Sequence, residues 1–254
     1  MRKNTVKASL VAGEPVVGCF VTIPAPTAVE VAAAAGFDFI IIDAEHGSAD
    51  LETVENMIRA AETFDCVPIV RIAVNQPQVI LRYLDAGALG VQMPQIQNAT
   101  EAKRVVDAVK YRPFGRRGLA SIRAARYGIG VPLGRYVQEA NEETLVVVHV
   151  ETPEAVAEAE AIARVPGVDV VFVGPTDLSY SLGYPGEPMR SEVQSVIHKV
   201  FTAVLAAGKV PGIWAGSPES ARNYVARGAR YIAVTERSLI VPAFQAFVKG
   251  IKGA

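Results

Sequence analysis

The stretch AAAAGFDFIIID, residues 32–43, contains the unit from which this chain is built. An alanine-rich segment suited to a helix ends at Gly36, where a glycine can cap the helix, and an apolar strand-like run follows up to Asp43. The same order returns in LDAGALGV (84–91) and VARGARYI (225–232). The sequence therefore indicates an internal repeat of one helix–strand unit.

Eight strand-like segments follow one another along the chain, separated by segments with helical periodicity. We expect strands at 15–21, 37–43, 67–72, 88–94, 145–151, 168–174, 210–215 and 230–236. We expect helices at 50–63, 76–86, 98–109, 153–164, 191–207, 218–227 and 239–249. Continuous Val and Ile runs are typical of parallel strands that are covered by helices on both faces. Eight units in 254 residues predict a single α/β domain over residues 1–254, a (β/α)8 barrel. A doubly wound open sheet is the alternative that periodicity alone leaves open.

Composition limits the possible functions. Hydrophobic residues make up 50% of the chain and charged residues 20%, which predicts a folded domain with a large core. The formal net charge of −1 argues against nucleic acid as a partner. Cys19 and Cys66 are far apart and indicate neither a disulfide framework nor a thiolate zinc site. No apolar segment is long enough for a signal peptide or a membrane span, so we expect a cytoplasmic protein with no membrane partner.

One segment departs from the repeat. Residues 111–143 carry six arginines and five glycines between the fourth and fifth expected strands. A long excursion of this kind is functional or intersubunit in many proteins, but a solvated basic loop fits the composition equally well.

Polar residues gather at the expected carboxyl ends of the strands, where barrel enzymes build their sites. These residues, together with one tryptophan, are Asp43, Glu45, His46, Arg71, Gln92, His149, Glu151, Asp177 and Trp214. Each alone could be a turn residue or a buried ion pair, but Arg71, Glu151 and Asp177 come from different strands and would converge at one mouth. Carboxylates with one or two imidazoles suit a divalent cation, with oxygen ligands favouring Mg²⁺ or Mn²⁺. Direct binding by His149 would move the preference toward Co²⁺ or Zn²⁺.

Some chemistries lack support in the sequence. No lysine lies at an expected strand end, which argues against a Schiff-base mechanism. No glycine-rich phosphate loop follows a strand, which argues against nucleotide or phosphosugar substrates. His198 lies in the middle of an expected helix and is interpreted as structural.

Taken in order, these segments resemble the HpcH/HpaI aldolase family, the metal-dependent class II pyruvate aldolases. The resemblance covers nearly the whole chain. It is carried by FDFIIIDAEHG (37–47), PIVRI (68–72), YLDAGALGVQMP (83–94), RPFGRRG (112–118), VHVETPEAV (148–156), VDVVFVGPTDLSYSLGYPGEP (168–188) and GKVPGIWA (208–215). The patterns D-x-E-H-G and G-P-x-D-L-S-x-S-L-G are specific in this order and spacing, whereas each alone would be weak.

The resemblance implies a (β/α)8 barrel that cleaves 4-hydroxy-2-oxo acids into pyruvate, or a related 2-oxo acid, and an aldehyde. It implies that Glu151 and Asp177 hold the divalent metal. Arg71 would bind the keto oxygen and stabilise the enolate. His46 would be the general acid or base, held by Asp43 or Asp85.

The family also implies how the rest of the substrate is held and how the chain assembles. The backbone of the GPTD segment, Gly174, Pro175, Thr176 and Asp177, would bind the substrate carboxylate. The family is often hexameric, so we expect a homo-oligomer, a hexamer or a trimer. The C-terminal helix, with its apolar run LIVPAFQAFVKGI (239–251), would pack on a neighbouring subunit.

The chain departs from the family pattern at several positions. His149 stands two residues before Glu151, where the family usually has glutamine, so the imidazole could bind the metal or contact pyruvate. Trp214 replaces a smaller apolar residue and is expected to narrow the aldehyde side of the pocket. Phe20 stands where the family often has tryptophan, and AVTERSLI (233–240) replaces a segment that tends to carry a glycine and an aspartate.

Two other functions remain as alternatives. Acyl-CoA lyases of the malyl-CoA or citramalyl-CoA type use the same fold and metal pair, although those relatives are generally longer. A ligand-binding relative that has lost its chemistry is disfavoured by the presence of His46, Arg71, Glu151 and Asp177 together.

Overall fold

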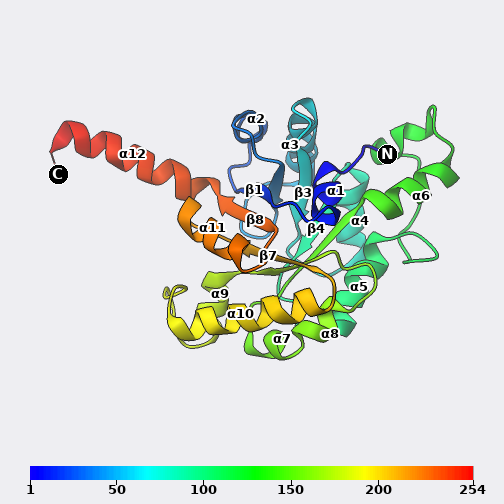
Figure 1. The fold of residues 1–254 in the computed structure, drawn as a ribbon. Coiled ribbons are helices and arrows are strands. Elements are labelled where there is room, and N and C mark those ends of the chain that lie inside the picture. Colours follow the sequence, from blue (N-terminus) through cyan, green and yellow to red (C-terminus); the bar gives the residue numbers. More distant parts are fainter. Residues whose placement is uncertain (254) are drawn as a thin grey trace.

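Eight parallel strands pair in chain order and close into a barrel in the computed structural model, which describes residues 1–253 (Figure 1). The strands are β1 (Val16–Val21), β2 (Phe39–Asp43), β3 (Val67–Arg71), β4 (Gly90–Met93), β5 (Leu145–His149), β6 (Val170–Val173), β7 (Val210–Trp214) and β8 (Tyr231–Thr235). β1 pairs with β2 on one side and with β8 on the other, where Val16 lies beside Tyr231. This closing pair excludes the open sheet and confirms the predicted (β/α)8 barrel. All eight predicted strands are present, and each is shorter than predicted.

Alternate residues of each strand face the interior of the barrel, because successive side chains of a strand point to opposite faces. On β2, Phe39 and Ile41 pack inside the barrel, whereas Ile40 and Ile42 pack against the surrounding helices. Gly18 leaves room for this packing, since a Cβ there would lie 2.0 Å from the Phe39 ring. The same alternation continues to the strand ends and decides which side chains reach the mouth.

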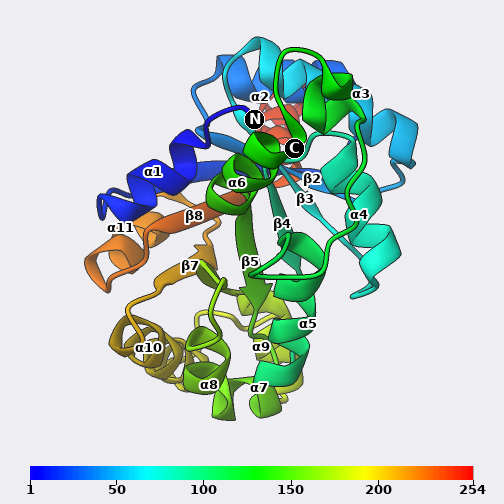
Figure 2. The same cartoon turned by 90° about the vertical axis from the view of Figure 1, so that its right-hand side faces the viewer.

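Helices surround the barrel, as Figure 2 shows. They include α2 (Pro26–Ala34), α3 (Leu51–Thr63), α4 (Pro77–Asp85), α5 (Ala99–Val109), α7 (Pro153–Ala157), α8 (Ala159–Ala163), α10 (Ser191–Ala206) and α11 (Pro218–Ala226). Segment 153–164, predicted as one helix, forms two short helices that meet at Glu158 (φ −95°, ψ 2°). The short helix α9 (Pro175–Ser181) follows β6 after Gly174, and its seven residues, about two turns, are fewer than the roughly 11 or more over which a helical pattern can be recognised in a sequence.

The amino end of the barrel is closed by α1 (Thr5–Val11), whose Val6 and Leu10 pack into the interior cluster. The predicted excursion at 111–143 is partly helical and contains η1 (Arg123–Gly128) and α6 (Leu133–Glu143). In Figure 1 it lies next to the amino terminus, and the Met1 amino group forms an ion pair with Glu139 of α6.

The C-terminal helix α12 (Glu236–Lys252) projects away from the barrel (Figure 1). Its buried residue is Glu236 at the first turn, whereas Phe244, Phe247 and Ile251 are more than two-thirds exposed, at 69%, 74% and 77%. Within residues 1–253 no helix has the length and apolar character needed to cross a membrane.

Candidate active site

Strand alternation brings the polar strand-end side chains to one mouth of the barrel. Asp43, Arg71 and His149 lie in phase with the interior residues of their strands, and Asp43 is the register partner of Arg71. A pocket of about 300 Å³ opens there. It is lined by Phe20, His46, Arg71, His149, Phe172, Gly174, Pro175, Thr176, Asp177, Trp214, Thr235 and Arg237. The structure thus places most of the predicted site residues around a single cavity.

Arg71 is held in place by Asp43. Its Nε donates to Asp43 Oδ1 at 2.9 Å and its Nη2 donates to Oδ2 at 2.5 Å. Burial would raise the pKa of Asp43, but these bonds and the charge of Arg71 bring the pKa below its ordinary value. The remaining nitrogen, Nη1, lies 3.2 Å from Glu45 Oε2. A guanidinium fixed through two nitrogens presents the rest of its edge to the pocket in a set direction.

His46 lies at the rim of the mouth with its side chain 62% exposed. Its backbone N–H donates to Asp43 Oδ1 at 3.2 Å, so Asp43 holds the main chain of His46 and leaves the imidazole free. The carboxylate beside the ring is that of Glu45, whose Oε2 lies 3.9 Å from His46 Nε2. Burial raises the pKa of Glu45. From the sequence, Glu45 was predicted to lie at a strand end and was given no role. Its position in the D-x-E-H-G pattern was the feature that could have identified it as a site residue.

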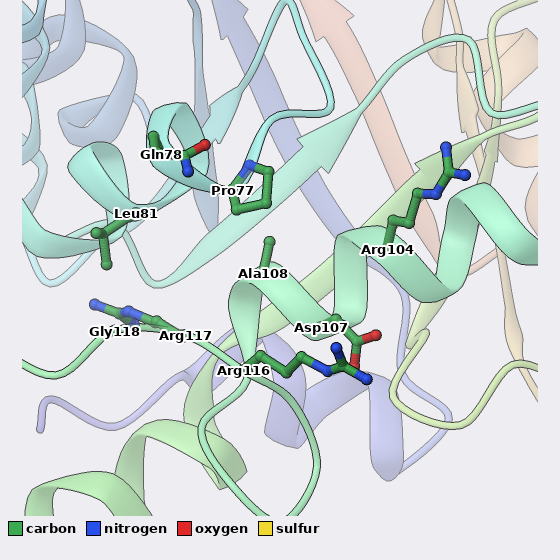
Figure 3. Close-up of a pocket in the computed structure, with 9 residues that line it drawn as sticks. All are labelled: Pro77, Gln78, Leu81, Arg104, Asp107, Ala108, Arg116, Arg117 and Gly118. Carbon is green, nitrogen blue, oxygen red and sulfur yellow. The ribbon is translucent and has the colours of Figure 1, made fainter.

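Asp85, the other predicted partner of His46, is not among the residues that line the mouth. It ends α4, and its Oδ1 accepts a hydrogen bond from Arg117 Nη2 at 2.7 Å. The side chain of Arg117 is 1% exposed and borders a separate pocket of about 350 Å³, with residues of α4 and α5 around it (Figure 3). Within one chain, Asp85 therefore anchors the 111–143 excursion and does not contact the imidazole.

Glu151 and Asp177 approach one another beside Gly174. A Cβ on Gly174 would lie 2.9 Å from Glu151 Oε2 and 3.3 Å from Asp177 Oδ2, so both carboxylates face a small volume that the glycine leaves open. Burial, followed by the charge of Glu151, raises the pKa of Asp177. Two oxygen donors of this kind fit Mg²⁺ or Mn²⁺, with water and substrate as the other ligands. Within residues 1–253 no three or more His, Cys, Asp or Glu side chains are grouped so that they could hold a metal together.

Both oxygens of Glu151 already have partners in the protein. Oε1 accepts from the backbone N–H of Gln95 at 2.8 Å, and Gln95 has a left-handed backbone (φ 56°), which is uncommon for a residue with a side chain. Oε2 lies 3.1 Å from His149 Nδ1, and His149 Nε2 lies 2.7 Å from Gln92 Nε2. Because both imidazole nitrogens are engaged by side chains, His149 is poorly placed to be a metal ligand and gives no reason to prefer Co²⁺ or Zn²⁺ over the other ions.

The ends of β7 and β8 line another part of the mouth, and the end of β8 contributes residues that the sequence did not assign to the site. The half-buried Trp214 donates from Nε1 to Thr235 Oγ1 at 3.0 Å. Glu236 Oε1 accepts from the backbone N–H and hydroxyl of Thr22 at 2.8 and 2.6 Å, which ties α12 to the loop after β1. Arg237 is exposed, lines the pocket and forms no ion pair with any residue in the described range 1–253. These residues belong to the segment AVTERSLI (233–240), whose departure from the family pattern was the feature that could have identified them as site residues.

Known proteins were compared with the chain at the level of sequence and of structure. Residues 16–240 match the HpcH/HpaI aldolase/citrate lyase family. The chain is 40% identical to the 4-hydroxy-2-oxovalerate aldolase of Rhodococcus jostii (strain RHA1), over 91% of this chain and 89% of the relative. It is 37% identical to the 4-hydroxy-2-oxo-heptane-1,7-dioate aldolase of Shigella sonnei (strain Ss046), over 96% and 93% of the two chains. A crystal structure of an HpcH/HpaI aldolase/citrate lyase family protein from Burkholderia cenocepacia J2315 superposes with a TM-score of 0.92 at 34% identity, covering 98% of this chain and 100% of the other.

Proposed function

The chain belongs to the HpcH/HpaI aldolase/citrate lyase family, and from this premise we propose that it cleaves 4-hydroxy-2-oxo acids reversibly into pyruvate and an aldehyde. Family membership makes it a carbon–carbon lyase of the aldolase type. The observation that carries the proposed reaction is the convergence of Glu151 and Asp177 beside Gly174. Gly174, Asp177 and Arg71 line the same cavity. An enolate next to a carboxylate is stabilised by nearby positive charge, which a cation held by Glu151 and Asp177 would supply together with Arg71.

Members of this family are generally dependent on a divalent metal. Glu151 and Asp177 would hold the ion, which we propose to be Mg²⁺, Mn²⁺ or Co²⁺. When bound, the ion supplies positive charge that polarises the 2-oxo acid. Without a cation the pair is costly for Asp177, because partial burial and the charge of the neighbouring Glu151 raise the pKa of Asp177 and so disfavour its charged form.

Arg71 supplies the second positive charge. Held by Asp43 through two hydrogen bonds, its guanidinium directs N–H groups at the keto oxygen of pyruvate and stabilises the negative charge that develops there on C–C cleavage. The start of α9, from Gly174 to Asp177, lines the same cavity, and its backbone would bind the substrate carboxylate.

His46 is the proposed general acid or base. Its imidazole lines the cavity, is exposed to water and makes no hydrogen bond to Asp43, so it is free to exchange protons with the 4-hydroxyl of the substrate through a water molecule. Glu45, 3.9 Å away, is the carboxylate that would balance a protonated ring.

The aldehyde side of the cavity is bounded by Trp214 and Arg237. The indole narrows the cavity, and the exposed guanidinium would favour aldehydes that carry a negative charge. We also propose a cytoplasmic homo-oligomer, a hexamer or a trimer, in which the exposed apolar residues of α12 are covered by a neighbour. Sedimentation of the protein as a monomer would contradict this assembly.

The first experiment is the exchange of the pyruvate methyl protons in D₂O, followed by NMR. Metal-stripped protein is assayed alone and with Mg²⁺, Mn²⁺ or Co²⁺ added back, and no aldehyde is required because every pyruvate aldolase of this type must form the enolate. Exchange that depends on metal and is lost with EDTA supports the proposal. Absence of exchange with every metal would exclude pyruvate as the nucleophile and direct the search to CoA thioesters and longer 2-oxo acids.

A further inference from the structure

A line of buried polar side chains crosses the barrel interior and ends at Glu151. The Tyr231 hydroxyl, on β8, lies 2.9 Å from Gln92 Oε1 on β4. Gln92 Nε2 lies 2.7 Å from His149 Nε2, and His149 Nδ1 lies 3.1 Å from Glu151 Oε2. Tyr231 and Gln92 are 0% exposed and His149 is 1% exposed, so water does not compete for these bonds. Every member of this line lies in a region where an unpaired polar atom would be costly.

The donors and acceptors of the line can be assigned from their chemistry. Burial raises the pKa of Tyr231 well above its ordinary value, so the hydroxyl keeps its proton and donates to Gln92 Oε1. The amide nitrogen of Gln92 can only donate, so His149 Nε2 must accept. The single ring proton of a neutral imidazole is then on Nδ1, where it is donated to Glu151 Oε2.

The opposite orientation of the Gln92 amide is less favourable. The amide nitrogen would then donate to Tyr231 and leave the phenol proton without an acceptor in the barrel interior. Gln92 Oε1 would require a proton on His149 Nε2, and a neutral ring would then direct its bare Nδ1 at the carboxylate of Glu151. Both costs are avoided when the hydrogen bonds run from Tyr231 through Gln92 and His149 to Glu151.

We propose that Tyr231, Gln92 and His149 act as positioning residues that fix Glu151 as a metal ligand. The inference rests on the proposed function, in which Glu151 holds the divalent ion. Gln95 fixes Oε1 and the imidazole fixes Oε2, so the carboxylate plane is set before metal binds. This assigns His149 a role as a hydrogen-bond donor in place of the family's glutamine, with neither metal nor substrate bound to the ring.

The direction of the hydrogen bonds is tested on metal-free protein by ¹⁵N NMR with labelled histidine. The chain has only three histidines, and the His149→Gln variant identifies the His149 signals by their loss. We expect a neutral ring with the proton on Nδ1. A proton on Nε2, alone or together with one on Nδ1, would overturn the assignment.

The positioning role is tested by Mn²⁺ affinity, measured from the EPR signal of the free ion and without any turnover. We expect His149→Leu to raise the dissociation constant by about 10-fold to 100-fold, with smaller increases for Gln92→Leu and Tyr231→Phe. His149→Gln keeps an N–H donor and should recover most of the affinity. The matched control is Tyr111→Phe, which removes a buried hydroxyl from the separate cluster around Tyr136 and should leave the affinity unchanged.

The outcomes separate this inference from the proposed function. Unchanged Mn²⁺ affinity in His149→Leu, or an affinity in His149→Gln no better than in His149→Leu, overturns the positioning role alone. A wild-type protein that binds no Mn²⁺ overturns the metal site and the positioning role together. Pyruvate proton exchange is then measured on the same samples, and its absence despite tight metal binding contradicts only the proposed reaction.

Discussion

Buried polar side chains have different surroundings at the two ends of the barrel. At the amino end, Lys110 donates from Nζ to the carbonyl oxygens of Asn141 and Thr144 at 2.8 and 2.6 Å. Asn4 likewise donates to the carbonyls of Leu89 and Glu143 at 3.0 and 2.9 Å. These side chains bind the backbone of neighbouring elements and hold α1, α5 and α6 against the strand starts.

At the carboxyl end, several carboxylates lie close together. Glu45 Oε2, which faces Arg71 Nη1 at 3.2 Å, and Glu236 Oε2 are buried and make no hydrogen bond within the described residues 1–253. Burial and the neighbouring charge of Glu151 raise the pKa of Asp177. Carboxylate oxygens gathered in this way destabilise the metal-free protein and favour the binding of a cation. In barrels of this kind, residues at the amino end generally serve stability and residues at the carboxyl end serve function.

The largest effect is expected from substitutions that remove a carboxylate from the mouth. Glu151→Gln and Asp177→Asn should each weaken Mn²⁺ binding more than about 100-fold, because direct ligands matter more than the residues that orient them. Asp177→Asn should also leave the metal-free protein as stable as wild type or more so, since it removes the repulsion from Glu151 that helps to raise the pKa of Asp177. Glu151→Gln should instead destabilise the metal-free protein, because the fold holds the pKa of Glu151 below its ordinary value and its carboxylate pairs with the Gln95 N–H and His149. Isothermal titration and urea unfolding measure the two quantities, with the exposed Glu154→Gln of α7 as control. A variant with wild-type affinity would remove that residue from the ligand set.

The next largest effect is expected in the pH dependence of the unfolding free energy, through Lys110 at the amino end of the barrel. Burial, with a contribution from Lys7, lowers the pKa of Lys110 to about 7 from the value of 10.5 expected in the unfolded chain. Between these values the unfolded chain binds the extra proton, so the stability of wild type should rise with pH relative to Lys110→Met, which lacks the group. We expect the unfolding free energy of wild type minus that of Lys110→Met to increase by about 2 kcal/mol from pH 7 to pH 9. Metal affinity should not change. A decrease of this difference with rising pH would contradict the lowered pKa.

A smaller effect is expected for the aldehyde side. Trp214→Leu enlarges the cavity and removes the bond to Thr235, so relative kcat/KM should shift toward bulky aldehydes by about 10-fold, the range that apolar pocket contacts provide. Pyruvate proton exchange should stay near the wild-type rate, since Trp214 has no proposed contact with the metal or with the keto oxygen. Unchanged preference between small and bulky aldehydes would exclude the steric role.

The smallest effect concerns Arg237. Because this guanidinium is exposed and screened by solvent, Arg237→Gln should raise KM for carboxylated aldehydes only about 2-fold to 5-fold, with little change for neutral ones. The difference should diminish at high salt. Arg222→Gln on α11 removes an exposed arginine outside the cavity and is the matched control. An equal effect on both classes of aldehyde would show that Arg237 does not select for charge.

Much of the fold was predictable because it depends on local patterns. The apolar runs, their number and the glycines that end the preceding helices indicated the eight strands and the barrel. The sequence placed Asp43, Arg71 and His149 at the strand ends, and the two-residue alternation of strands explains why the structure has them on the inner face. Short elements such as α9 were not predictable because one or two helical turns are too few for a pattern to be recognised. The break at Glu158 between α7 and α8 is a change in one residue's backbone angles that the surrounding sequence does not indicate.

The sequence by itself determined which residue types stand at the strand ends and hence the chemistry available at the mouth. Only the tertiary structure decided their partners. Asp43 binds Arg71 instead of the His46 ring, Asp85 binds Arg117, and Tyr231 reaches Gln92 across 139 positions of sequence. Hydrogen bonds depend on a few tenths of an ångström and on donor direction, and those quantities are set by barrel closure and side-chain packing, which no local pattern records.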